Sequence, residues 1–152
     1  MTLEEQLLDS WRIANRINLY FLDNVPPDAL HGKAEKGKSV AGQFSHIHSV
    51  RLMWIKASAP DLMEELAKIE DSAPVEELKA ALDASARTVE KLVERGLAEG
   101  KIKNFKPHPA AFVGYLIAHE ANHRGQAELI LRQLGSPIPD KASYGLWEWG
   151  SR

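Results

Sequence analysis

The chain contains no cysteine. This absence excludes disulfide bonds, thiolate metal ligands and a cysteine nucleophile, and it leaves histidine, aspartate and glutamate as the strong metal-binding side chains. It also agrees with a reducing compartment such as the cytosol.

Long apolar runs are missing as well. No stretch approaches the roughly 20 residues that a membrane-spanning helix needs, and the acidic start MTLEEQLLDSW lacks the basic region of a secretory signal peptide. We therefore expect a cytoplasmic protein that does not interact with membranes.

An excess of positive charge is absent too. The chain has 19 Lys plus Arg and 21 Asp plus Glu, a formal net charge of -2, so it has no overall attraction for nucleic acid. Lys33, Lys36 and Lys38 lie close together, but no aromatic residues alternate with them. This pattern favours a solvated loop over a phosphate-binding track.

What the sequence does have is helical periodicity. Its 152 residues, 44% of them hydrophobic, fit one domain over residues 1–152. Capping residues and prolines delimit four long amphipathic segments, and no segment has the period of a strand. The sequence thus predicts an all-α protein, a four-helix bundle with short connections. The segments run from Thr2 to before Pro26, from Ser39 to about Ala57, from Pro74 towards Gly96 and Gly100, and from Pro107 to Gly135.

Two further segments are shorter. A loop with a short helix around Leu62, Leu66 and Ile69 is predicted between the second and third long helices. The tail, residues 136–152, carries Trp147 and Trp149. Because aromatic side chains bring a large apolar area to bury, we expect these tryptophans to pack on the bundle; a dimer interface or the mouth of a site is the alternative.

The fourth long segment combines a regular apolar stripe with two histidines. His119 and His123 are four residues apart, so both rings lie on one face of the helix and can converge on one ion. A buried polar group without a partner costs on the order of 1–3 kcal/mol, and a metal ion would satisfy both rings. The stripe consists of Phe112, Leu116, His119, His123, Ala127, Ile130 and Leu134.

The letters from His119 to His123 also spell H-E-x-x-H, a motif in which two histidines bind zinc and the glutamate acts as general base. Glu120 is therefore a candidate base, and a solvent-facing helix glutamate is the equally weighted alternative. A zinc peptidase usually also has an edge strand for its substrate and a further ligand downstream. No strand is predicted here, and Glu128 is only five residues past His123.

A third ligand is expected from the second long segment, which contains His46 and His48. At about 100° per residue these two side chains point roughly 200° apart, so at most one faces His119 and His123. Periodicity does not decide between them. On the fourth segment, Tyr115 and Gln126 lie within about 40° of His119 on the helical wheel, close enough to orient ligands or substrate.

The pairing of SVAGQFSHIHSVRLMW with HEANHRGQAELILRQLG resembles the DinB/YfiT-like family. Its pattern, a histidine in the second helix followed by H-x-x-x-H-R-x-Q in the fourth, matches His46, His119, His123, Arg124 and Gln126. The resemblance implies a four-helix bundle, often a homodimer, with a three-histidine site for one divalent transition metal. Zinc or nickel is favoured, with iron or manganese as alternatives, and the resemblance favours His46 as the third ligand.

Characterised members of this family are metal-dependent enzymes, among them thiol S-transferases that use bacillithiol and mycothiol-dependent isomerases. The resemblance thus implies a hydrolase or thiol transferase that activates water or a low-molecular-weight thiol on a small-molecule substrate. Tyr115, Arg124 and Gln126 are expected beside the substrate or the ligands. The alternatives are a zinc peptidase and a metal-binding protein without catalytic activity.

Overall fold

The predicted helices begin where their capping side chains are. In the computed structural model, which describes residues 1–152, Thr2 and Glu5 form a reciprocal capping box at the start of α1 (Leu3–Asp23). The hydroxyl of Ser39 accepts a hydrogen bond from the amide of Gly42 at 2.9 Å and caps α2 (Val40–Ser58). At the start of α4 (Pro109–Gln133), Nδ1 of His108 accepts from the amide of Ala111 at 3.1 Å.

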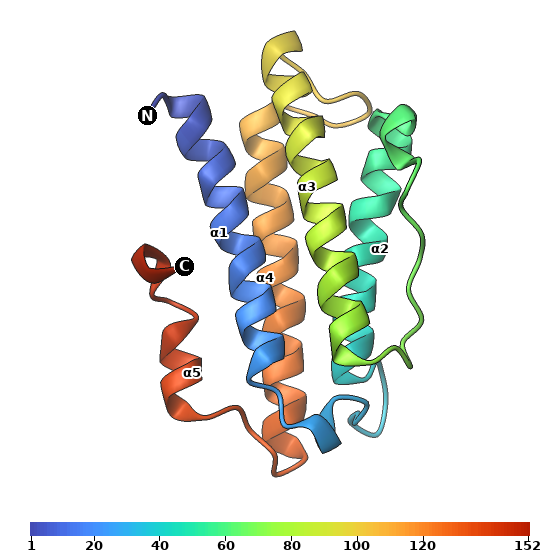
Figure 1. Ribbon diagram of the computed structural model, residues 1–152, viewed down its shortest axis with the longest axis vertical. Helices are drawn as coiled ribbons and strands as arrows, with labels where there is room; N and C mark the ends of the chain where they lie inside the picture. Colours follow the sequence, from blue (N-terminus) through green and yellow to red (C-terminus); the bar gives the residue numbers. More distant parts are fainter.

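The remaining long helix is α3 (Val75–Glu99), and Figure 1 shows all four side by side. A short helix, α5 (Asp140–Gly145), and three 3-10 turns complete the chain, which has no strand. The prediction of an all-α four-helix bundle is confirmed. The 3-10 turns are Pro27–Ala29, Pro60–Met63 and Trp149–Ser151.

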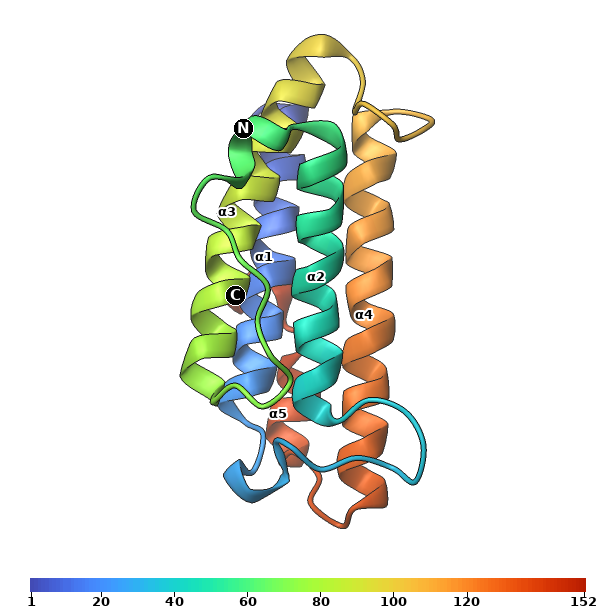
Figure 2. The same ribbon diagram turned by 90° about the vertical axis from the view of Figure 1, so that its right-hand side faces the viewer.

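The four long helices do not simply alternate in direction along the chain. α2 and α3 run in the same direction, and residues 59–74 run back along α2 to connect them (Figure 2). Two parallel neighbours require such a long crossover, so the prediction of short connections is wrong here. The predicted short helix around Leu62, Leu66 and Ile69 is likewise reduced to the 3-10 turn Pro60–Met63.

The core consists of two apolar clusters. One contains Phe21, Phe44 and Leu131, and the other contains Trp11 and Phe112. The four long helices also bury polar side chains, and most of these lie between the residues of one cluster and those of the other along their helix. The buried polar side chains are Asn15, Asn18, Gln43, Ser45, His48, Arg51, Ser85 and Glu120.

Arg51 lies at the centre of this polar layer. Its Nε and Nη2 donate to the two carboxylate oxygens of Glu120 at 2.6 and 2.8 Å. Nη2 also donates to Oδ1 of Asn15, and Nη1 donates to the carbonyl of Leu82 and the hydroxyl of Ser85. All five N–H groups of the guanidinium therefore have partners, and those partners come from α1, α3 and α4.

The other side of the ion pair is equally satisfied. Nδ2 of Asn18 donates to Oε2 of Glu120 at 2.9 Å. The guanidinium of Arg51 lies 4.9 Å from the centre of the Trp11 ring, a favourable cation–π distance. A buried ion pair is tolerated when its remaining hydrogen-bonding groups are filled in this way.

The tail packs on the bundle, but not through its tryptophans. Ile138, Ala142 and Leu146 are buried in the core cluster of Phe21 and Phe44. Trp147 is 81% exposed and Trp149 is 37% exposed. The expectation that the two tryptophans dock is wrong, because aliphatic residues of α5 and its flanks supply the contact instead.

The guanidinium of Arg152 lies 3.7 Å from the centre of the Tyr20 ring and holds the end of the chain against α1. Along the whole chain, no helix combines the length and the apolar character that crossing a bilayer requires.

Replacing Arg51 with methionine should lower the free energy of unfolding by about 3–5 kcal/mol, because the carboxylate of Glu120 would remain buried without its partner. Urea denaturation provides the measurement. The double variant Arg51→Met/Glu120→Leu should recover part of the loss, since no unpaired charge remains in the core.

Arg87→Met is the matched control, because it breaks the exposed i,i+4 contact with Asp83 and should cost no more than about 0.5 kcal/mol. Equal losses in Arg51→Met and Arg87→Met would contradict the structural role of the buried pair.

Candidate metal centre

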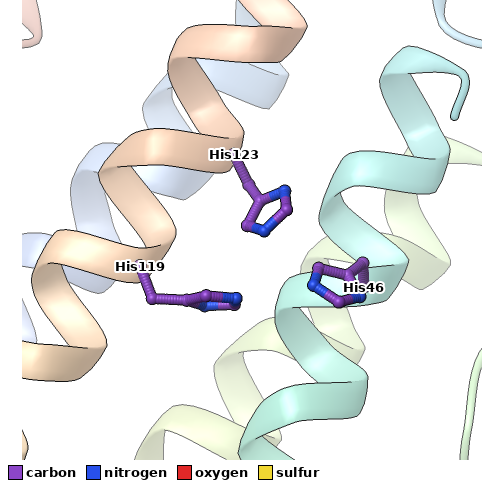
Figure 3. A group of neighbouring side chains, drawn as sticks. All are labelled: His46, His119 and His123. Carbon is purple, nitrogen blue, oxygen red and sulfur yellow. The ribbon is translucent and has the colours of Figure 1, made fainter. Parts of the chain in front are cut away.

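Three histidines converge between α2 and α4. His46 projects from α2 towards His119 and His123 of α4, as Figure 3 shows. The centre of the His46 ring lies 5.4 Å from that of His119 and 4.3 Å from that of His123, and the ring centres of His119 and His123 are 4.6 Å apart. One nitrogen of each ring lies within 4.8 Å of the other two, close enough for the three to share one ion.

A glutamine fixes the orientation of one ring. Nδ1 of His123 lies 2.7 Å from Oε1 of Gln43, and because an amide oxygen only accepts, the hydrogen is on Nδ1 and Nε2 is free for a metal. Nε2 of Gln43 in turn donates to Oε1 of Gln126 at 3.3 Å. Such a contact behind a ligand sets both the tautomer and the direction of the ring.

Sequence reasoning missed Gln43, which is 4% exposed. The available signal was its position three residues before His46, since residues at this spacing share one face of a helix. Gln126 was predicted, and it reaches His123 only through Gln43.

Burial favours the neutral form of all three rings. Burial lowers the pKa of His123 to about 4, and the nearby rings of His46 and His119 and the charge of Lys38 add to this effect. Burial also lowers the pKa of His46, with further contributions from His119 and Lys38. For His119, burial lowers the pKa while Glu120 opposes the shift. Neutral imidazole is the form that binds metal ions.

The donor set fits a divalent metal. Nδ1 of His119 is the one buried side-chain nitrogen or oxygen that has no hydrogen-bond partner, and it belongs to the ring cluster itself. Buried polar atoms are normally paired. Three neutral imidazoles suit zinc, nickel, iron and related ions, so His46, His119 and His123 are the residues that would hold the metal.

His48 faces a different part of the molecule. Its Nε2 donates to the carbonyl of Ala67 at 2.8 Å, and its Nδ1 accepts from the hydroxyl of Ser85 at 3.0 Å. Both nitrogens of this buried ring are therefore used, and the structure groups His46, rather than His48, with the histidines of α4.

Glu120 lies neither in solvent nor beside the histidine cluster as a free base. It is 1% exposed, and its oxygens accept hydrogen bonds from Arg51 and Asn18. The expectation of a solvent-facing side chain is wrong, and the geometry gives no support to the candidate general base. The physical reason is the helical turn: Glu120 follows His119 by about 100°, which directs it into the core.

The other predicted site residues divide into two groups. Tyr115 stacks near His119, with ring centres 6.2 Å apart, and its hydroxyl accepts from Nε1 of Trp54 at 3.4 Å. Arg124 instead points towards α1, where its Nη1 donates to Oδ1 of Asn18 at 2.7 Å. Tyr115 thus borders the histidine cluster, whereas Arg124 bonds to Asn18 of the polar layer and is not placed beside the ligands.

These features define a class: an all-α bundle with a three-histidine cluster, suited to a metal ion, between two antiparallel helices. The chain belongs to the DinB family, whose family model matches residues 1–149. Among individually curated proteins, the comparison finds no significant match.

We predict that the purified protein binds about one divalent transition metal per chain. His46→Ala should weaken this binding roughly 100-fold or more, because one of three nitrogens is lost. His48→Ala should leave the affinity nearly unchanged, although it removes two hydrogen bonds of a buried ring and lowers stability. Elemental analysis and zinc titration provide the measurements, with circular dichroism as the control for folding. Loss of zinc binding in His48→Ala alone would overturn the assignment.

The metal-free protein should lose stability on acidification. Unfolded histidines bind protons near pH 6.5, whereas the folded protein holds the pKa of His123 at about 4, so protonation favours the unfolded state as the pH falls from 6.5 towards 4. After allowance for solvent screening, the free energy of unfolding should fall by roughly 1 kcal/mol or more between pH 7 and pH 5.

Urea midpoints measured with a chelator test this expectation, and His123→Gln should show a smaller fall over the same range. Equal stabilities of the wild-type apoprotein at pH 7 and pH 5 would contradict it.

Proposed function

We propose that the protein is a metal-dependent enzyme of the hydrolase or thiol S-transferase type that activates water or a small thiol at the His46, His119 and His123 centre. The observation that carries the proposal is the composition of the cluster: three histidines without a fourth histidine or carboxylate. Structural zinc sites are usually closed by four protein ligands, whereas catalytic sites have three and leave a position for water or substrate.

A bound divalent ion, zinc or nickel by preference and iron or manganese as alternatives, supplies a Lewis acid that lowers the pKa of water or a thiol. The chain contributes orientation. Gln43 holds the hydrogen of His123 on Nδ1, so that Nε2 keeps its lone pair. Tyr115, 38% exposed beside His119, presents a hydroxyl that can orient a substrate.

A zinc peptidase is the weaker alternative. Its mechanism needs the glutamate of H-E-x-x-H as a base near the metal, but the carboxylate of Glu120 is engaged by Arg51 and Asn18. The fold also has no strand on which a peptide could be aligned. A metal-binding protein without catalysis remains the second alternative.

The proposal includes a small-molecule substrate, a homodimeric state and a cytoplasmic location, without nucleic-acid or membrane partners. The dimer is supported by the resemblance to its family, and light scattering coupled to size-exclusion chromatography tests it.

The enzyme classes are separated by parallel assays on protein loaded with zinc, nickel, iron or manganese. Conjugation of a chlorodinitrobenzene electrophile to 2-mercaptoethanol reports thiol transfer, p-nitrophenyl acetate reports hydrolysis, and casein reports peptidase activity. Metal-dependent turnover in either of the first two assays supports the proposal. Failure of both with every metal, while the metal still binds, would favour the non-catalytic alternative.

In whichever assay is active, we expect His119→Ala to reduce metal-dependent activity by at least about 100-fold, because the site loses a ligand. Glu120→Gln should reduce the activity per folded molecule much less. A general base contributes typically 10²–10⁴-fold, but the carboxylate of Glu120 is engaged by Arg51 and Asn18, so we expect no loss of that size. Equal losses with the metal retained in Glu120→Gln would restore the base mechanism.

A further inference from the structure

The loop between α1 and α2 forms one wall of a cleft that reaches one histidine of the metal centre, His123. Figure 2 shows this loop extending towards α4 before it enters α2. Backbone hydrogen bonds hold it in place: the amide of Val40 donates to the carbonyl of Gly32 at 2.9 Å, and that of Ala41 donates to the carbonyl of Leu30 at 2.8 Å. Lys33, Lys36 and Lys38 therefore lie in a loop whose two ends are held together by backbone hydrogen bonds.

Two of these lysines line the cleft together with a metal-binding residue. The cleft has a volume of about 350 Å³, and its wall includes Lys36, Lys38, Gln43, His123 and Gln126. Between the lysines, Gly37 has a φ of 101°, a left-handed conformation that side-chain-bearing residues rarely adopt, and this residue turns the chain there. Lys38 is close enough to lower the pKa of both His46 and His123.

The cleft has positive charge without compensation. No aspartate or glutamate lines it, and neither Lys36 nor Lys38 takes part in a salt bridge. Glu35 is exposed in the same loop but does not line the cleft, and Asp71 lines the adjacent hollow with Lys38. The three ligands are neutral histidines, so a bound divalent ion would add its full charge to that of the lysines.

We propose that this cleft binds the anionic group, a carboxylate or a phosphate, of the small molecule that reacts at the metal centre. The inference rests on the proposed function and names the class of substrate: an anion whose reactive end reaches the ion while Lys36 and Lys38 contact its oxygens. A protein with a net charge of -2 thereby attracts an acidic substrate locally. The side-chain amides of Gln126 and Gln133 supply further hydrogen-bond donors along the same wall.

A charge series of thiols tests the proposal on zinc-loaded protein by isothermal titration calorimetry. The series is 3-mercaptopropionate, 2-mercaptoethylphosphonate, neutral 2-mercaptoethanol and cationic cysteamine. The anionic thiols should bind more tightly than 2-mercaptoethanol, and cysteamine most weakly. Thiol acidity alone predicts the reverse order, because the ammonium group makes cysteamine the most acidic thiol. Tighter binding of 3-mercaptopropionate would indicate a carboxylate as the preferred group, and tighter binding of 2-mercaptoethylphosphonate would indicate a phosphate.

Lys36→Gln/Lys38→Gln should weaken the anionic thiols roughly tenfold and leave 2-mercaptoethanol unchanged. Lys36→Glu/Lys38→Glu should reverse the preference towards cysteamine. The matched control is Lys101→Gln/Lys103→Gln, which removes the same charge at the opposite end of the bundle, in the connection between α3 and α4. Unchanged affinity in the cleft variant, or equal weakening in the control, would overturn the proposal.

A second measurement does not depend on thiol binding. Succinate, but not 1,4-butanediol, should shift the backbone amide resonances of Lys36 and Lys38 in ¹H–¹⁵N spectra of the zinc-loaded protein, and added salt should suppress the shift. If no thiol binds but succinate produces this shift, the thiol arm of the proposed function fails and the anion site stands. If thiols bind regardless of charge and succinate shifts nothing, the anion site fails and the metal centre stands.

Discussion

The ion pair between Arg51 and Glu120 is the contact on which the rest of the structure depends. One guanidinium binds groups from α1, α3 and α4, and a charge in this environment is costly to leave unpaired. Apolar side chains tolerate small sliding movements, but a bidentate pair does not. Because Glu120 directly follows His119, the contact that fixes α2 against α4 also fixes how the imidazoles of the two helices meet.

Much of this organisation could be predicted from the sequence. Thr2 and Ser39 mark the starts of their helices because a hydroxyl caps free amides, and both cap as expected. The four-residue interval between His119 and His123 places their rings together in any helix. Periodicity places His46 and His48 on opposite faces of α2, and both of these faces are buried. The choice of His46 as the ligand therefore required the resemblance to a family.

The missed features share a physical cause: each depends on contacts between distant segments. The spacing of Phe112, Leu116 and Glu120 is as helical as that through His119, and only the presence of Arg51 makes Glu120 the buried choice. The parallel direction of α2 and α3 leaves no periodic signal, since a crossover loop and a hairpin loop differ only in length. For Trp147, composition indicates burial, but Leu146 takes the position against the bundle.

The location of the ligands in the chain has a consequence for biogenesis. His46 lies in the second helix, whereas His119 and His123 lie in the fourth, so no local hairpin can assemble the three nitrogens. During synthesis, the complete three-nitrogen set forms only after nearly the whole chain has emerged and α4 has packed against α2. Before α4 is made, α2 supplies only His46 of the three histidines, and a single imidazole binds a metal ion weakly. Binding of an ion by all three histidines would therefore require a completely folded domain, so the metal would be acquired after translation and would not act as a template for folding.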